Sequence, residues 1–161
     1  MATYAKDTTV DAGRSRTEIE RTLARYGATS FGYATEDTPD GGRAAISFIR
    51  AGRQVRFVVA LPSRTERRFT HTPGRGNPRS PEAAQREWEQ ACRQRWRALA
   101  LLVKAQLEAV ESGILTFEEA FLEQTVIPGT GHTVAQHIGA ELDQSIESGS
   151  TPRLLIDGGA R

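Results

Sequence analysis

The chain has 161 residues, of which 38% are hydrophobic, and this is enough material for one domain with a substantial core. A single cysteine excludes an intramolecular disulfide, and no apolar run approaches the roughly 20 residues that crossing a bilayer requires. Residues 1–10 lack the apolar core of a signal peptide, so we expect a soluble cytoplasmic protein that does not enter a membrane.

The net charge of +1 conceals an uneven distribution of charged residues along the chain. Residues 1–42 carry 5 basic and 7 acidic side chains, residues 43–104 carry 14 and 4, and residues 105–161 carry 2 and 9. The middle segment, with a net charge of +10, is therefore a candidate surface for a polyanion. Most of the basic residues are arginine, which suits bidentate phosphate contacts, although a GC-rich genome also favours arginine.

The first part of the chain predicts an arm, a helix and a strand. Residues 1–13 are polar and unpatterned, which favours a flexible arm. In residues 17–26 the apolar side chains recur at steps of four and three, a pattern typical of a short amphipathic helix. Residues 29–35 alternate between apolar and small or polar side chains, which predicts a half-buried strand, and residues 38–42 contain the proline and glycines of a turn.

Two further strands are predicted at residues 44–50 and 53–61. Only Ala51 and Gly52 separate them, a spacing that fits a tight hairpin, with or without a bulge, although alanine is not the usual residue in such a turn. Together with the preceding strand they predict a three-stranded antiparallel sheet.

Residues 62–80 form a long connection without a regular pattern. Connections of this length are usually mobile or functional. The segment is rich in arginine and contains Arg64, Arg67, Arg68, Arg75 and Arg79.

A single long helix is predicted over residues 81–112. Ser80 is suited to the N-cap, Pro81 fits the first helical position, and Gly113 can adopt the left-handed conformation that closes a helix. Leu101 and Leu102 broaden the apolar character of its middle turns, so we expect those turns to be covered on more than one side. The main apolar stripe consists of Trp88, Cys92, Trp96, Leu99, Val103, Leu107 and Val110.

A polar, mostly cationic ridge lies beside this stripe and is either a solvated face or part of a binding surface. Its members are Arg86, Gln90, Arg93, Arg97 and Lys104.

Two shorter helices are predicted after the long one. Thr116 and Glu119 match a capping box ahead of residues 117–123, and Leu122 is expected among the buried contacts of that helix. Residues 134–148 place apolar side chains at steps of four, so we expect this last helix to pack by one stripe. The stripe consists of Val134, Ile138, Leu142 and Ile146.

The predicted class is α+β, with an N-terminal helix, a three-stranded antiparallel sheet, a long central helix packed on the sheet, and short C-terminal helices. We expect one domain over residues 14–156 and a tail at residues 157–161.

No pattern in the sequence indicates an enzyme, a metal site or a cofactor. His132 and His137 are five residues apart and His71 is distant, a spacing that does not supply a set of metal ligands. No serine, cysteine or threonine lies in a recognisable nucleophile context, and Cys92 lies on the apolar stripe, where a buried thiol is expected. We therefore expect a protein without catalytic residues and without a cofactor.

The strongest functional signal is the combination of the arginine-rich connection with the ridge on the long helix, because neutralising phosphates needs several cations on one surface. Phe69 lies among these arginines and is the preferred candidate for stacking on an unpaired base, whereas Trp88 fits the core stripe better. The candidate nucleic-acid-binding residues are Arg64, Arg67, Arg68, Phe69, Arg75, Arg79, Arg86, Arg93 and Arg97.

Several stretches resemble a family of small bacteriophage and prophage proteins. They are RYGATSF (residues 25–31), RFVVALP (56–62), RQRWRALA (93–100), LEAVESGI (107–114) and FEEAFL (117–122). The resemblance implies a phage origin and a bacterial host cell, and it brings no catalytic residues with it. In the order of elements alone, the chain is also similar to the double-stranded-RNA-binding fold and to the core of phage single-strand-annealing proteins.

The first hypothesis is a phage-encoded, non-enzymatic protein that binds the phosphate backbone of DNA or RNA, single- or double-stranded, with little dependence on sequence. The second is an inhibitor of host defence that captures a nucleotide signal in an arginine-lined pocket between protomers, or that binds a host protein. The third is a structural protein that forms homo-oligomers, in which the acidic end of one copy meets the basic middle of another.

Overall fold

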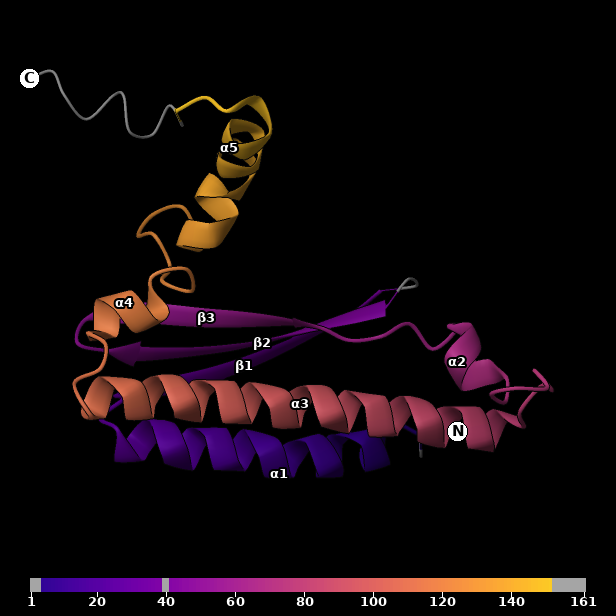
Figure 1. Ribbon diagram of the computed structural model, residues 1–161. Coiled ribbons are helices and arrows are strands. Elements are labelled where there is room, and N and C mark those ends of the chain that lie inside the picture. The colour runs from indigo at the N-terminus through magenta and orange to yellow at the C-terminus, as the bar shows by residue number, and fades with distance from the viewer. Residues whose placement is uncertain (1–3, 39–40, 152–161) are drawn as a thin grey trace, which may run out of the picture.

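The computed structural model describes residues 4–38 and 41–151 and has the predicted α+β architecture (Figure 1). An antiparallel sheet of order β1-β2-β3 is covered on one face by the two long helices, α1 and α3. The elements in chain order are α1 (Tyr4–Arg25), β1 (Ser30–Thr38), β2 (Gly41–Arg50), β3 (Arg53–Ala60), α2 (Arg67–Thr70), α3 (Pro81–Glu111), α4 (Phe117–Phe121) and α5 (Val134–Ser148).

The β2–β3 hairpin is confirmed and contains no bulge. Arg50 pairs with Arg53, and both intervening residues have positive φ, 51° at Ala51 and 73° at Gly52. These angles are those of the type I′ turn, whose twist matches that of the flanking strands. The turn predicted at residues 38–42 falls partly on residues 39–40, which lie outside the described part of the chain.

The core lies between the sheet and the two long helices. α1 and α3 run in the same direction, since Arg97 is paired with Glu18 at 3.5 Å and the Tyr26 hydroxyl donates a hydrogen bond to Glu108 further along both helices. The predicted stripe of α3 is confirmed, because its side chains from Trp88 to Leu107 are buried and Val110 is partly buried. The main core consists mostly of Ile19, Leu23, Tyr26, Ile46, Phe48, Val55, Phe57, Trp96, Leu99, Val103, Leu107, Phe117 and Phe121.

Both predicted capping devices of the long helix are present. The Ser80 hydroxyl accepts a hydrogen bond from the Ala83 amide, and Gly113 follows the helix with a φ of 76°. The capping box of Thr116 and Glu119 is also confirmed at the start of α4. None of the helices in the described ranges combines the length and apolar character that crossing a membrane requires.

Helix α1 begins at Tyr4 rather than at residue 17, so it includes most of the segment that the sequence predicts as a flexible arm. The helix continues through Gly13, whose carbonyl accepts a hydrogen bond from the Thr17 hydroxyl. Residues 4–13 carry no apolar stripe that would have indicated a helix, and helix propensity by itself is a weak guide. Residues 152–161, which include the predicted tail, lie outside the described residues.

Two predictions of burial are wrong, and a third holds only in part. The middle turns of α3 are covered on more than one side, by the sheet and by α1, but Leu101 and Leu102 lie on the remaining open side and are 53% and 48% exposed. Leu122 lies just beyond α4 and is exposed rather than packed. No described side chain of α5 is buried: Val134 and Ile138 of its stripe are partly buried, and Leu142 and Ile146 are exposed to solvent in the described part of the chain.

The turn between β2 and β3 provides a test of the fold. Replacing Ala51 with asparagine should raise the free energy of unfolding by about 0.5–1 kcal/mol, because asparagine adopts the left-handed conformation more readily than alanine and precedes Gly52 in the favoured order. Urea unfolding followed by circular dichroism measures the change. Ala51→Val is the control and should lower stability, since β-branched residues tolerate positive φ poorly; equal stability of the two variants would contradict the turn geometry.

Candidate functional site

The long helix α3 extends beyond the sheet that it covers (Figure 1). Its 31 residues span about 46 Å, whereas strands of 8 to 10 residues span roughly 26–33 Å. The first turns of α3 therefore carry apolar side chains past the end of the main core. Trp88 and Cys92 belong to a second cluster, which is completed by Phe69 of α2.

Residues 62–80 are ordered against this projecting end of α3. The indole Nε1 of Trp88 donates a buried hydrogen bond of 2.7 Å to the carbonyl of Pro62. The guanidinium of Arg64 lies 4.0 Å from the centre of a Trp88 ring and donates a hydrogen bond to Gln85. The connection is thus attached to α3 at the point where β3 ends.

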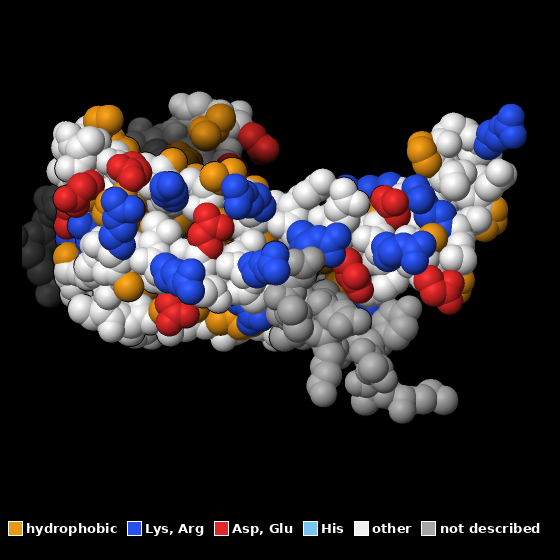
Figure 2. Space-filling view, turned by 90° about the horizontal axis from the view of Figure 1, so that it is seen from below, with side chains coloured by type: hydrophobic (Ala, Val, Ile, Leu, Met, Phe, Trp, Pro, Cys, Tyr) orange, Lys and Arg blue, Asp and Glu red, His pale blue; other side chains and the backbone are white. Residues whose placement is uncertain are grey.

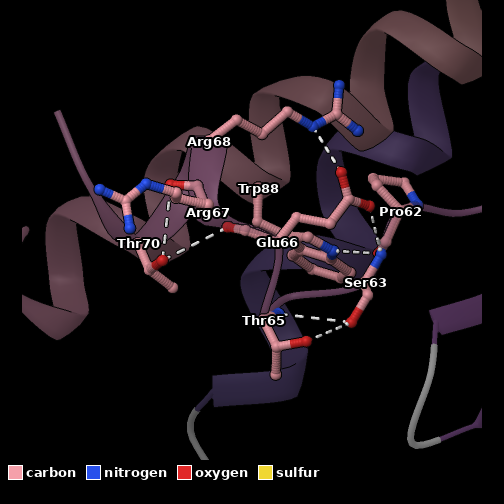
Figure 3. A network of polar contacts seen from close by, with 8 residues as sticks. All are labelled: Pro62, Ser63, Thr65, Glu66, Arg67, Arg68, Thr70 and Trp88. Carbon is pink, nitrogen blue, oxygen red and sulfur yellow. Dashed lines mark hydrogen bonds and ion pairs between the residues drawn. The ribbon is translucent and has the colours of Figure 1, made fainter. Parts of the chain in front are cut away.

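The carboxylate of Glu66 holds the next part of the segment together (Figure 3). Its two oxygens accept hydrogen bonds from the Ser63 amide at 2.9 Å and from Nε of Arg68 at 2.6 Å. The guanidinium of Arg68 also lies 4.5 Å from the centre of the Phe69 ring. Arg68 is therefore committed to an ion pair and to covering an aromatic side chain.

Residues 71–79 form a small hairpin that returns the chain to α3. His71 bridges to Pro78, and the Arg79 amide donates to the carbonyl of Thr70 at 2.7 Å. The Arg79 side chain is only 18% exposed, and it donates to the His71 carbonyl at 3.1 Å and pairs with Glu87 at 3.3 Å. Arg79 is thus mainly a tie between the hairpin and α3.

A pocket of about 670 Å³ lies between this segment and α3. A volume of this order falls within the range of small-molecule sites. Arg67 reaches it beside Gly76, where a Cβ atom would lie 3.1 Å from the guanidinium. The polar side chains in its wall are Arg67, Arg68, His71, Thr72, Arg79, Glu87, Gln90 and Gln94.

Among the described residues, no acidic side chain forms an ion pair with Arg64, Arg67, Arg75 or Arg86. Arg67, Arg75 and Arg86 are exposed. Arg75 lies at the turn of the small hairpin, between two glycines with positive φ. These cations are available for a ligand without first breaking an ion pair.

The structure brings together the five arginines of residues 62–80 and places Arg86 nearby on α3. Arg93 is partly buried further along the helix, and Arg97 is paired with Glu18 of α1. On the face seen in Figure 2, acidic side chains lie between the basic ones, so this face is not a continuous basic surface. Among the predicted site residues, the exposed arginines outside any ion pair, Arg64, Arg67, Arg75 and Arg86, therefore lie at the projecting end of α3.

Phe69 is a correction to the predicted site. It is only 4% exposed and packs with Trp88 and Cys92, with the Arg68 guanidinium over its ring. In this structure its ring is part of the core and is not presented to a nucleic-acid base. The sequence alone does not show that Phe69 is buried, because an aromatic residue among arginines has the same local pattern whether it is buried or exposed.

The pocket also contains residues that sequence reasoning did not select. The ridge predicted from the sequence includes Gln90, whereas Gln94 and Thr72 carry no signal of their own. The available signal was geometric, because Glu87, Gln90, Ala91 and Gln94 recur at steps of three and four on one face of α3. In the part of the chain that the structure describes, no group of three or more His, Cys, Asp or Glu side chains is arranged to hold a metal ion.

Comparisons with known proteins add no assignment. No protein-family model matches the chain, and neither curated proteins nor solved structures gave a match.

The chemistry of Cys92 can be tested directly. Burial raises the pKa of its thiol from 9.0 to about 11, and the positive charge of Arg64 opposes this only in part. At pH 8 the thiol of the folded protein should remain protonated and react with Ellman's reagent at least tenfold more slowly than in the protein unfolded in urea. Equal rates in the two states would contradict the burial of this cluster; the single cysteine makes the readout unambiguous.

Proposed function

We propose that the protein binds nucleic acid without catalysing a reaction, and that the arginine-rich end formed by residues 62–80 and the start of α3 contacts the phosphates. The observation that carries the proposal is the set of exposed arginines outside any ion pair, Arg67, Arg75 and Arg86, on an ordered part of the described chain. Arginine suits this role because its guanidinium donates two parallel hydrogen bonds to phosphate oxygens.

The order of residues 62–80 supports the proposal energetically. A disordered arginine-rich segment loses conformational entropy when it binds, and this loss reduces its affinity. Here the hydrogen bonds of Trp88 and Glu66 already hold the segment in place, so less entropy remains to be lost.

The proposed contacts are to the backbone of the nucleic acid rather than to its bases. Phe69 and Trp88 are both buried, so the aromatic stacking that the sequence suggested has no support at these positions. Phosphate contacts alone carry no sequence information, and binding should be tolerant of sequence and sensitive to salt. The resemblance to phage and prophage proteins supports a setting in the cytoplasm of a bacterial host cell.

The test is binding of fluorescently labelled single- and double-stranded DNA and RNA, measured by anisotropy over a salt series. Replacing both Arg67 and Arg75 with alanine should weaken binding at low salt by at least tenfold. The slope of the logarithm of the association constant against the logarithm of the salt concentration should become shallower by about 2 units, roughly one for each phosphate that is no longer neutralised.

The matched control is Arg25→Ala with Arg53→Ala, which removes the same charge from the opposite end of the molecule. Arg53 pairs with Glu118 beside α4, and Arg25 closes α1. This variant should bind with almost unchanged affinity. Equal reductions of affinity in the two variants would indicate attraction by net charge alone and would contradict a site at the arginine-rich end.

The pocket favours a second candidate function, the capture of a single nucleotide. Arg67, Arg79 and His71 line it together with uncharged polar side chains, a combination suited to a phosphate and a base or sugar. Unlike the pocket expected between protomers, this one lies within one chain. It would serve a protein that withdraws a nucleotide signal from host defence.

Filling the pocket distinguishes the two functions. Gln94 is exposed at the pocket wall, and Gln94→Trp should occupy much of the space without changing the charge. Calorimetric titration with nucleoside mono- and triphosphates should give one site per chain that is absent from this variant, if capture is the function. Unchanged oligonucleotide binding by the same variant, with no nucleotide binding by either protein, would support the backbone-binding function instead.

A further inference from the structure

Helix α5 has an apolar face that is partly covered at Val134 and Ile138 and is left exposed by the described chain further along the helix. Leu142 and Ile146 are 44% and 71% exposed, and no described side chain of the helix is buried. At 100° per residue, the apolar side chains and Gly139, with the exception of Ala140, occupy a sector of about 140°, which also contains Ser145. This sector is wider than a coiled-coil seam and suits packing against a broad surface. Apart from Ser145, it comprises Val134, Ala135, Ile138, Gly139, Leu142 and Ile146.

The base of α5 is held firmly to the edge of the sheet. A guanidinium nitrogen of Arg56 donates to the Gly131 carbonyl at 2.6 Å and to Gln136 at 3.0 Å. The Val134 amide donates to the Thr125 carbonyl at 2.9 Å, and Thr133 is buried. The helix consequently projects away from the sheet on the side opposite α1 and α3 (Figure 1).

This attachment argues against α5 folding back onto its own sheet. Laying the helix down would break the hydrogen bonds of Arg56 and Val134 and expose Thr133. Packing against a surface of another molecule breaks none of them. The occupant of the apolar face is therefore expected to be a separate chain.

The outer face of the sheet has the properties of the surface that α5 requires. One row across the three strands consists of Ala34, Ala45 and Val58, whose short side chains allow a helix to approach closely. Val58 is 48% exposed, and Ile49 on the same face is also exposed. The 15 residues of α5 span about 22 Å, which fits along strands of 8 to 10 residues.

The charges of the two surfaces are complementary. Glu141 and Asp143 flank the apolar sector of α5 on its two sides, and the helix has no lysine or arginine. The outer face of the sheet carries Arg43 on β2 and Arg56 on β3 against one acid, Glu36, which lies opposite Arg43 on β1, so the basic side chains are in excess. A helix of a second copy lying on this face would bring its acidic flanks beside these basic side chains.

We propose that two copies of the chain form a dimer by exchanging α5, so that the apolar face of each α5 packs on the outer face of the other copy's sheet. Because each chain supplies both the helix and the sheet, the exchange is reciprocal and closes with twofold symmetry. The proposal is independent of the proposed function, since neither surface includes the arginine-rich end.

The first test is the mass in solution, measured by light scattering after size-exclusion chromatography over a range of concentrations. The unaltered protein should be a dimer. Leu142→Glu with Ile146→Glu should shift it to monomer, and Val58→Glu should do the same from the sheet side. All three positions are exposed in the single chain, so circular dichroism should show that these variants remain folded.

The matched control is Leu101→Glu with Leu102→Glu, which places the same charge on exposed apolar positions of α3. This variant should remain a dimer. A monomer at every concentration of the unaltered protein would overturn the proposal. A dimer that survives Val58→Glu would also overturn it, because the contact would then lie elsewhere, for example between two α5 helices.

The second test identifies the two surfaces as partners. A chain carrying Leu142→Cys is mixed with a chain carrying Val58→Cys, and the mixture is treated with a short bismaleimide. A crosslinked heterodimer should form in the mixture and not with either chain alone, because Cys92 is buried. Crosslinking of the Leu142→Cys chain to itself, with none in the mixture, would contradict the exchange.

Discussion

The excess length of α3 over the sheet is the constraint on which the rest of the structure depends. The part of the helix over the sheet buries Trp96, Leu99, Val103 and Leu107 in the main core. The part that projects carries Trp88 and Cys92, and these side chains would be exposed to water without a second layer. Burying a large apolar side chain contributes roughly 1.5–3 kcal/mol, so covering it stabilises whichever segment provides the cover. The segment that does so is residues 62–80.

This cover explains how a sequence with so many arginines becomes ordered. Phe69 supplies the apolar surface, the Pro62 carbonyl accepts the indole proton of Trp88, and Glu66 draws Arg68 and the Ser63 amide together. Like charges close together repel one another, and the segment places Arg68 and Arg79 against the acids Glu66 and Glu87. The remaining cations are left on the surface. The same few contacts thus determine both the packing and the position of the charges. The arginine-rich end exists because residues 62–80 cover the apolar side chains at the projecting end of α3.

The sequence predicted those features that depend on local pattern. The stripe of α3, its Ser80 cap, the Thr116 capping box and the two-residue hairpin all follow from spacing and residue type, and all are present. The predictions that failed concern the surface against which a patterned element packs. The stripe of α5 has the same period as a packed helix, yet none of its side chains is buried in the described part of the chain. The burial of Phe69 depends on Trp88, and the hairpin of residues 71–79 is tied to α3 by the pairing of Arg79 with Glu87; no local pattern indicates either contact.

The division of the apolar interior into two clusters has a consequence for motion. The three buried residues of the second cluster are Phe69, Trp88 and Cys92, and partly buried Leu61 packs against both clusters. Residues 62–80 are held to α3 largely by this small cluster, so they can separate from the helix while the sheet remains intact, which amounts to local unfolding at a cost below the global free energy of unfolding. Amide hydrogens of residues 66–79 would then exchange with solvent faster than those of β2. A ligand held by these residues would slow that exchange, so the exchange rate of these amides would show whether the ligand is bound.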